Sequence, residues 1–159
     1  MARRLPPLHT NIGKRLVKSP KLYLRDTGIL HNLLDIRSWE NLLGHPALGA
    51  SWECLCIESI LARCRRSVRA SFYRTARGTE IDLVLEHGSQ RIAVECKASS
   101  SPRPRRGFWT AIEDIGSARN WVVARVDESY PLRNATVTSL RGFLEDDLNQ
   151  DLFEPVASC

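Results

Sequence analysis

The stretch from residue 80 to residue 97 constrains the fold of this chain more than any other. It reads EIDLVLEHGSQRIAVECK, which is two runs of alternating residues around a short polar turn containing Gly88. This pattern predicts an antiparallel β-hairpin. Its alternate positions are strongly apolar, from Ile81 to Val94, so we expect the hairpin to lie in the half-buried centre of a sheet.

The register of this hairpin predicts a chemical site. If the pairing is symmetric about the turn, Asp82 lies opposite Glu95, and Glu80 lies opposite Lys97. Two facing carboxylates repel each other unless one is protonated or a divalent cation lies between them. Carboxylate oxygens suit Mg²⁺ (or Mn²⁺), and a nearby lysine can serve a metal-bound water. The pattern favours phosphodiester hydrolysis, although a plain Glu80–Lys97 ion pair on a polar sheet face would also explain it.

The segments around the hairpin predict one α/β domain with a mixed sheet. The expected order is helix, three strands, helix, strand, and the connection through the second helix makes residues 91–97 and 120–126 parallel neighbours. The helix at 48–65 carries Glu53 and Glu58 about 140° apart, so both cannot address one site. Other expected elements are strands at 21–26, 71–75 and 135–138 and helices at 29–34, 39–43, 108–118 and 140–148.

The ends of the chain read differently from its middle. Residues 1–20 contain three prolines and predict a linker-like basic arm, residues 21–150 the domain, and residues 151–159 a tail. No window approaches eighteen consecutive apolar residues, and the N-terminus has no apolar signal core. We therefore expect a cytoplasmic protein without a membrane span. Five cysteines with no CxxC pair predict reduced, partly buried thiols rather than a zinc site.

The charge of the chain is uneven. The formal net charge is +5, but residues 1–78 hold 14 lysines and arginines against 5 acids, whereas residues 79–159 hold 9 against 13. A basic half is compatible with a DNA partner. Arg103, Arg105 and Arg106 directly follow the strand that carries Lys97, where they could contact phosphates. A solvated arginine-rich loop is the alternative for these three residues.

The chain resembles a known superfamily in this arrangement of residues. Glu53 on a helix, Asp82 on the second strand and Glu95-x-Lys97 on the third resemble the PD-(D/E)xK nucleases, whose restriction endonuclease-like core is αβββαβ. Ile81 stands where the signature has proline. More closely, four blocks resemble a bacterial and archaeal domain of unknown function that follows an AAA+ ATPase module. These blocks are NIGKRLVKSPKLYLRDTGIL (11–30), GASWE (49–53), YRTARGTEIDLVLE (73–86) and IAVECKAS (92–99).

The resemblance implies roles for individual residues. Asp82 and Glu95 would bind the metal, Glu80 would assist them, Lys97 would be the catalytic lysine, and Glu53 would be a further acid. The chain has no G-x-x-x-x-G-K-[ST] motif and cannot bind ATP through a P-loop. An ATPase would then be a partner or a missing preceding domain. The alternative is a non-catalytic module that binds DNA or such a partner.

Overall fold

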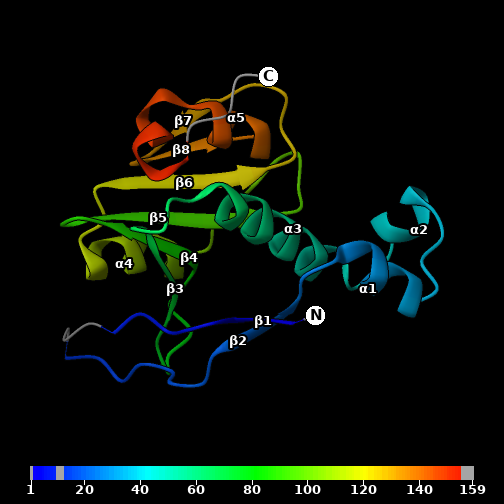
Figure 1. Ribbon diagram of the computed structural model, residues 1–159, viewed down its shortest axis with the longest axis horizontal. Coiled ribbons are helices and arrows are strands. Elements are labelled where there is room, and N and C mark those ends of the chain that lie inside the picture. The colour runs from blue at the N-terminus through cyan, green and yellow to red at the C-terminus, as the bar shows by residue number, and fades with distance from the viewer. Residues whose placement is uncertain (1, 10–12, 155–159) are drawn as a thin grey trace.

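The structure is a computed structural model that describes residues 2–9 and 13–154. A six-stranded mixed sheet has the order β3-β4-β5-β6-β8-β7, and β1 and β2 form a separate two-stranded sheet (Figure 1). The strands are β1 (Ala2–Leu5), β2 (Lys21–Leu24), β3 (Arg69–Arg74), β4 (Glu80–His87), β5 (Gln90–Lys97), β6 (Arg119–Ala124), β7 (Tyr130–Leu132) and β8 (Ala135–Thr138). The helices are α1 (Thr27–Leu33), α2 (Trp39–Leu43), α3 (Leu48–Arg63), α4 (Arg106–Ile115), α5 (Leu140–Glu145) and the 3-10 helix η1 (Asp147–Leu152).

The sheet has a helix on each face. Ile57 and Ile60 of α3 pack in one core cluster with Leu83 and Val94, whereas Ile112 of α4 packs in a second cluster on the opposite face. This three-layer arrangement buries both faces of the central strands, as their apolar sequences require. The expected α/β class is confirmed, and the order α3-β3-β4-β5-α4-β6 is the expected one. Strands β5 and β6 are parallel, also as expected.

The hairpin has the predicted register over most of its length. Five pairs run from His87↔Gln90 to Leu83↔Val94, each symmetric about the turn. The ladder then ends, so the expected pairs Asp82–Glu95 and Glu80–Lys97 do not form. The register is therefore correct near the turn and wrong at the other end of the hairpin.

A β-bulge in β4 explains this break. Between the pairs Ser71↔Val84 and Tyr73↔Ile81, β4 advances three positions while β3 advances two. The extra residue falls at Asp82–Leu83, and such an insertion bends a strand and re-aims its side chains. As a result, Ile81 packs in the α4 cluster and Leu83 in the α3 cluster, with Asp82 between them. The sequence contains no glycine or proline near Asp82 that would indicate a bulge.

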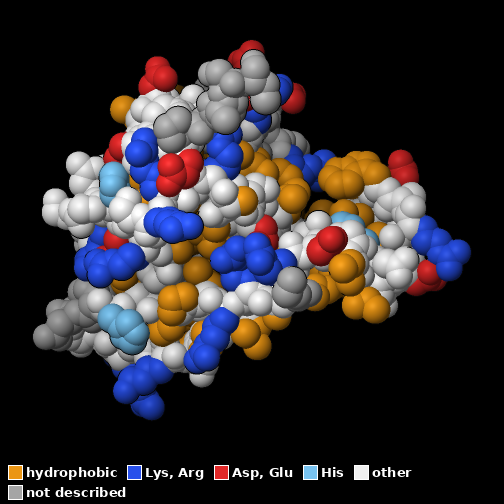
Figure 2. Space-filling model, in the orientation of Figure 1, with side chains coloured by type: hydrophobic (Ala, Val, Ile, Leu, Met, Phe, Trp, Pro, Cys, Tyr) orange, Lys and Arg blue, Asp and Glu red, His pale blue; other side chains and the backbone are white. Residues whose placement is uncertain are grey.

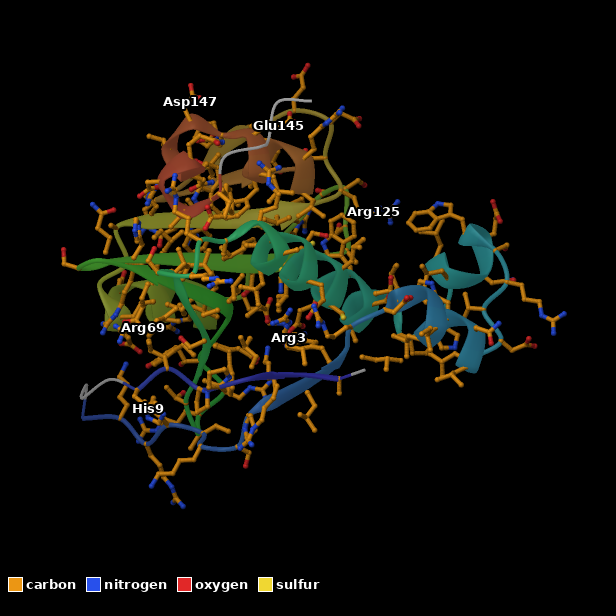
Figure 3. The ribbon with its side chains drawn as sticks, viewed as in Figure 1. Arg3, His9, Arg69, Arg125, Glu145 and Asp147 are labelled. Carbon is orange, nitrogen blue, oxygen red and sulfur yellow. The ribbon has the colours of Figure 1, made fainter. Side chains whose placement is uncertain are left out.

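The N-terminal residues differ from the expected unpacked arm. Strand β1 pairs with β2, and residues 6–8 run beside β3, where the Leu8 amide donates to the Phe72 carbonyl at 2.7 Å. Leu5 and Leu8 are only 2% and 3% exposed. In Figure 3, Arg3 of β1 lies below α3, and its guanidinium pairs with Glu58. This segment therefore covers the outer edge of β3 and contributes side chains to the core. Its prolines had favoured the prediction of an unpacked arm.

The C-terminal residues are packed as well. The expected helix at 140–148 ends at Glu145, and η1 follows it. Leu152 and Phe153 are fully buried in the α3-side core, and Phe153 forms a bridge with Cys64. The start of the expected tail is thus part of the fold, while residues 155–159 lie outside the described residues.

Helices α1 and α2 form a lobe beside the main body (Figure 1). No residue of α1 is buried, and Leu33 is 72% exposed. Hydrophobic side chains accordingly show on the surface of this lobe in Figure 2. Arg125 follows β6 in the main body and is labelled in Figure 3. Its guanidinium lies 4.8 Å from the centre of the Trp39 ring of α2, and this contact connects the main body to the lobe. Within residues 2–9 and 13–154, no helix has the length and hydropathy needed to cross a membrane.

Candidate functional site

Three carboxylates converge on a single lysine. The Lys21 ammonium of β2 lies 2.8 Å from Glu53 Oε1 on α3, 2.7 Å from Glu80 Oε1 and 3.2 Å from Asp82 Oδ1, both on β4. Tyr23, two positions along β2, donates its hydroxyl to the same Glu53 oxygen at 2.6 Å. Lys21 and Tyr23 therefore present one face of β2 to these acids. We call Lys21, Glu53, Glu80 and Asp82 the lysine cage.

The charges in the lysine cage stabilise one another. Burial lowers the pKa of Lys21, but Asp82 and Glu53 outweigh it and hold this pKa above its usual value. Burial raises the pKa of Glu80, but hydrogen bonds from Arg74 and Lys21 keep it below the ordinary value. The Lys21 ammonium and the Glu80 carboxylate are thus both charged at neutral pH.

Asp82 is fixed between two elements. It is 7% exposed, and its Oδ2 accepts a hydrogen bond from the Cys96 amide of β5 at 3.0 Å. Its other oxygen contacts Lys21. The bulge lets the Asp82 carboxylate accept a hydrogen bond from a backbone amide of β5 just beyond the last ladder pair. The two strands therefore remain connected there through a side chain.

Glu95 and Lys97 lie close together at the end of β5 as a second pair of ionisable groups. Lys97 Nζ lies 2.5 Å from Glu95 Oε1, and Glu95 is 7% exposed. Burial raises the pKa of Glu95 to about 8, with the negative charge of Asp82 acting in the same direction and Lys97 opposing it. Burial lowers the pKa of Lys97, but Glu95 raises it above its usual value. The residues of the predicted ion pair Glu80–Lys97 thus have other partners.

A pocket of about 450 Å³ opens beside these residues. Four acids and bases predicted from sequence line it together, namely Glu80, Asp82, Glu95 and Lys97. The loop after β5 completes the lining with Ser99, Ser101, Arg103 and Arg105. A lining that combines carboxylates with arginines suits a ligand that carries both a metal ion and phosphate groups.

Two glycines shape the rim of this pocket. Gly78, in the turn between β3 and β4, has a φ of +83°, a backbone conformation that residues other than glycine rarely adopt. Gly107, in the first turn of α4, approaches it closely, because a Cβ there would lie 3.3 Å from the Gly78 carbonyl oxygen. Both residues line the pocket. The absence of a side chain at Gly107 lets α4 pack against the turn, whereas Gly78 is required there by its positive φ.

Two other predicted site residues, Glu53 and Arg106, are not part of the pocket lining. Glu53 does not line it and instead faces Lys21 and Tyr23. Arg106 is an exposed residue at the start of α4 and is not part of the lining. Sequence reasoning missed Lys21, Tyr23 and Arg74, which neutralise or hydrogen-bond the acids. The alternation of Lys21 and Tyr23 along a strand was the available signal, but nothing in the sequence linked that strand to residues 53 and 82.

The donor set can be compared with the needs of a divalent cation. Among the residues that the structure describes, no three His, Cys, Asp or Glu side chains are grouped to hold a metal ion. Oxygens of Glu53, Glu80 and Asp82 instead surround the Lys21 ammonium. Asp82 and Glu95 remain as two neighbouring carboxylates that line the open pocket, and two carboxylates plus waters are a common arrangement for Mg²⁺.

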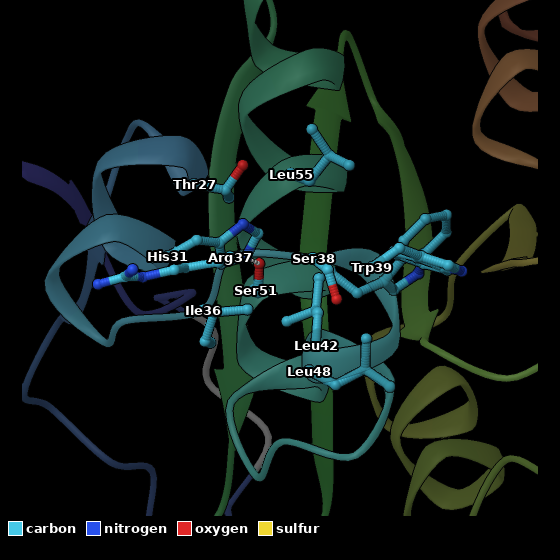
Figure 4. Close-up of a pocket in the computed structure, with 11 residues that line it drawn as sticks. Thr27, His31, Ile36, Arg37, Ser38, Trp39, Leu42, Leu48, Ser51 and Leu55 are labelled. Atoms are coloured by element: carbon cyan, nitrogen blue, oxygen red, sulfur yellow. Dashed lines mark hydrogen bonds between the residues drawn. The ribbon is translucent and has the colours of Figure 1, made fainter.

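A second, apolar pocket lies in the α1–α2 lobe. Its volume is about 380 Å³, and side chains of α1, α2 and α3 surround it (Figure 4). Leu42, Leu48 and Leu55 supply much of its lining, and His31 forms a hydrogen bond with Ser51 at 2.7 Å on its wall. None of the residues predicted as catalytic or metal-binding lines this pocket.

The chain is similar to proteins whose functions are not described. It is 36% identical over 137 residues to uncharacterized proteins of Mycobacterium tuberculosis and Mycobacterium bovis. The match covers 86% of this chain but only 31% of each relative, so the chain spans about a third of their length. No solved structure matches the chain.

Two family models match separate parts of the sequence. Residues 1–40 match a model described as Domain of unknown function (DUF8612). Residues 48–143 match one described as Domain of unknown function (DUF4143), which is more than half of the chain. The chain therefore belongs to the DUF4143 family.

Proposed function

We propose that this domain is a metal-dependent nuclease-type module that hydrolyses DNA phosphodiesters. The carrying observation is that Asp82, Glu95 and Lys97 line one pocket together with Arg103 and Arg105. The element order α3-β3-β4-β5-α4-β6 supports a restriction endonuclease-like, PD-(D/E)xK relationship. The resemblance of four sequence blocks to a domain that follows an AAA+ ATPase module is our reason to propose an AAA+ ATPase as the functional partner.

Each residue of the pocket has a distinct task in this proposal. Asp82 and Glu95 would hold Mg²⁺ or Mn²⁺, with Glu80 assisting at the rim. When bound, the metal ion supplies Lewis acidity and lowers the pKa of a water molecule. Lys97 lies beside Glu95 and orients the attacking water, and its charge favours the anionic transition state. The Cys96 amide and Lys21 fix the orientation of Asp82.

The loop after β5 would bind the DNA backbone. Arg103 and Arg105 are exposed and line the same pocket as the carboxylates. Arginine matches phosphate geometry with two parallel hydrogen bonds. Such contacts position the backbone without reading its bases.

Cleavage assays test this function. Plasmid and single-stranded DNA are incubated with Mg²⁺ or Mn²⁺ and with wild type, Lys97→Met or Asp82→Asn, and with Lys18→Met as an exposed-lysine control. We expect cleavage by wild type and by the control, and loss of at least about 100-fold in the two site variants, the scale of a general acid–base contribution. Cleavage that survives both site variants would contradict the proposed site.

One observation favours the non-catalytic alternative. The single positive charge of Lys21 already contacts three of the four acids near the pocket and offsets part of their negative charge, so the need for a metal ion is reduced. A module that binds DNA without cleaving it would show salt-dependent affinity that EDTA and Asp82→Asn leave unchanged. Absence of cleavage by folded wild type, combined with that binding behaviour, would replace the nuclease proposal with this one.

A further inference from the structure

Lys21 reaches the site from outside the central sheet. It lies on β2, which pairs only with β1 among the described strands, whereas the acids it contacts lie on α3 and β4. Its side chain is 13% exposed. Elements far apart in the sequence thus meet at one ammonium group, which makes the contact a built feature rather than a surface ion pair.

The number of partners matches the capacity of the ammonium group. A lysine ammonium has three N–H donors, and Lys21 has one carboxylate oxygen from each of Glu53, Glu80 and Asp82 within 3.2 Å. Without Lys21, the three acids would face one another, and their remaining partners would be Arg74 on Glu80, the Tyr23 hydroxyl on Glu53 and the Cys96 amide on Asp82. Carboxylates in that situation need another cation or a proton.

We infer that Lys21 is a resident cation in a position that would otherwise accept a divalent metal ion. The three oxygens surround the ammonium at 2.7–3.2 Å, whereas Mg²⁺ and Ca²⁺ bind oxygens at about 2.0–2.6 Å. Without Lys21, an inward shift of these three carboxylate oxygens would convert the lysine cage into a metal site. Lys21 excludes that metal ion while it is present, and it supplies the positive charge itself.

The inference has a consequence for metal stoichiometry, and this part rests on the proposed function. Asp82 is shared, because one oxygen faces Lys21 while the side chain also lines the pocket with Glu95. The pocket side is left for one divalent ion at Asp82 and Glu95. Glu53, which does not line the pocket, then acts as a positioning residue that holds Lys21 and is not a metal ligand.

Calorimetric titration with Mn²⁺ tests the inference. The variant is Lys21→Met, which keeps an unbranched apolar side chain and removes the ammonium group, and the matched control is Lys18→Met on the same segment. We expect Lys21→Met to bind one Mn²⁺ more than wild type and the control to equal wild type. The extra site should disappear in the double variant Lys21→Met/Glu53→Gln, because Glu53 is a ligand only in the lysine cage.

The outcomes separate this inference from the proposed nuclease function. Wild type that binds no Mn²⁺ contradicts the proposed metal site, yet an extra ion in Lys21→Met would still support the resident cation. Equal stoichiometry in Lys21→Met and wild type overturns the inference. Should Lys21→Met be unfolded in EDTA, refolding is followed by circular dichroism with and without Mn²⁺. Recovery only with Mn²⁺ supports the inference, and failure in both conditions overturns it.

Discussion

The backbone amide of Cys96 donates a hydrogen bond to Asp82 Oδ2 at 3.0 Å, across the point where the β4–β5 ladder has ended. A side chain thereby replaces a backbone acceptor next to a bulge. This contact makes Asp82 a structural residue as well as a candidate metal ligand. Its substitution should therefore have an effect on folding that is separate from any effect on activity.

Asp82→Ala should destabilise the protein by about 1–3 kcal/mol, because the Cys96 amide would lose its partner in a buried place. The free energy of unfolding in urea measures this at pH 6, where Glu95 holds its proton. Asp127→Ala is the control, since Asp127 is exposed, and should change that free energy by less than about 0.5 kcal/mol. Equal effects of the two variants would mean that the contact adds nothing to stability.

The N-terminal strand should contribute to global stability. Leu5 is 2% exposed in the core, so Leu5→Ala should lower the free energy of unfolding by about 2–5 kcal/mol. Leu22 lies in the same two-stranded sheet but is 72% exposed, and Leu22→Ala should be nearly neutral. Denaturant titration of both variants checks this. A Leu5→Ala variant with an unchanged free energy of unfolding would show that residues 2–5 do not contribute to the stability of the core.

Stability should fall as the pH rises through neutrality. Folded Glu95, with its pKa near 8, holds its proton in the range where the unfolded side chain, with a pKa near 4.5, has lost it. The folded state therefore binds more protons between these values, and its stability decreases as the pH rises from about 4.5 to about 8. Melting temperatures measured in EDTA at pH 5.5 and 8.5 should differ less in Glu95→Gln than in wild type.

The exposed Glu128→Gln is the control for this pH experiment and should keep the wild-type difference. A Glu95→Gln variant whose melting temperature falls as steeply as that of wild type would show that Glu95 ionises normally in the folded protein. Added Mn²⁺ should flatten the wild-type dependence, because a cation beside Asp82 and Glu95 favours the ionised carboxylate.

The pocket arginines should account for part of the salt dependence of DNA binding. Arg103→Ala and Arg105→Ala should each weaken the binding of labelled duplex DNA and reduce the slope of log affinity against log salt by about 1. Arg106 is exposed but does not line the pocket, so Arg106→Ala should have a smaller effect. Fluorescence anisotropy at three salt concentrations measures both quantities. Equal slopes in all three variants would place the DNA elsewhere.

Local patterns were sufficient to predict much of this fold. The alternation in residues 80–97 predicted the hairpin and its register up to Leu83↔Val94, and the run at 120–126 predicted a strand parallel to β5. Glu53 and Glu58 have separate partners, as their helical spacing required. These features depend on side-chain periodicity within one element or one turn, and periodicity is visible in a single sequence.

Features that depend on distant contacts were not predictable. Strand β1 contains two arginines and is four residues long, so nothing local distinguishes it from a solvated arm until β2 pairs with it. The bulge at Asp82 is visible only from the pairing with β3. The contact of Lys21 with Asp82 spans 61 positions, and no spacing rule connects residues so far apart.

The lysine cage also crosses a boundary between the two matched sequence families. Lys21 falls within residues 1–40, whereas Glu53, Glu80 and Asp82 fall within residues 48–143. An expression fragment trimmed to the larger match would keep every acid and lose the lysine. Its measured metal affinity would then describe a site that the longer chain does not possess. The two segments are best produced and studied as one inseparable unit.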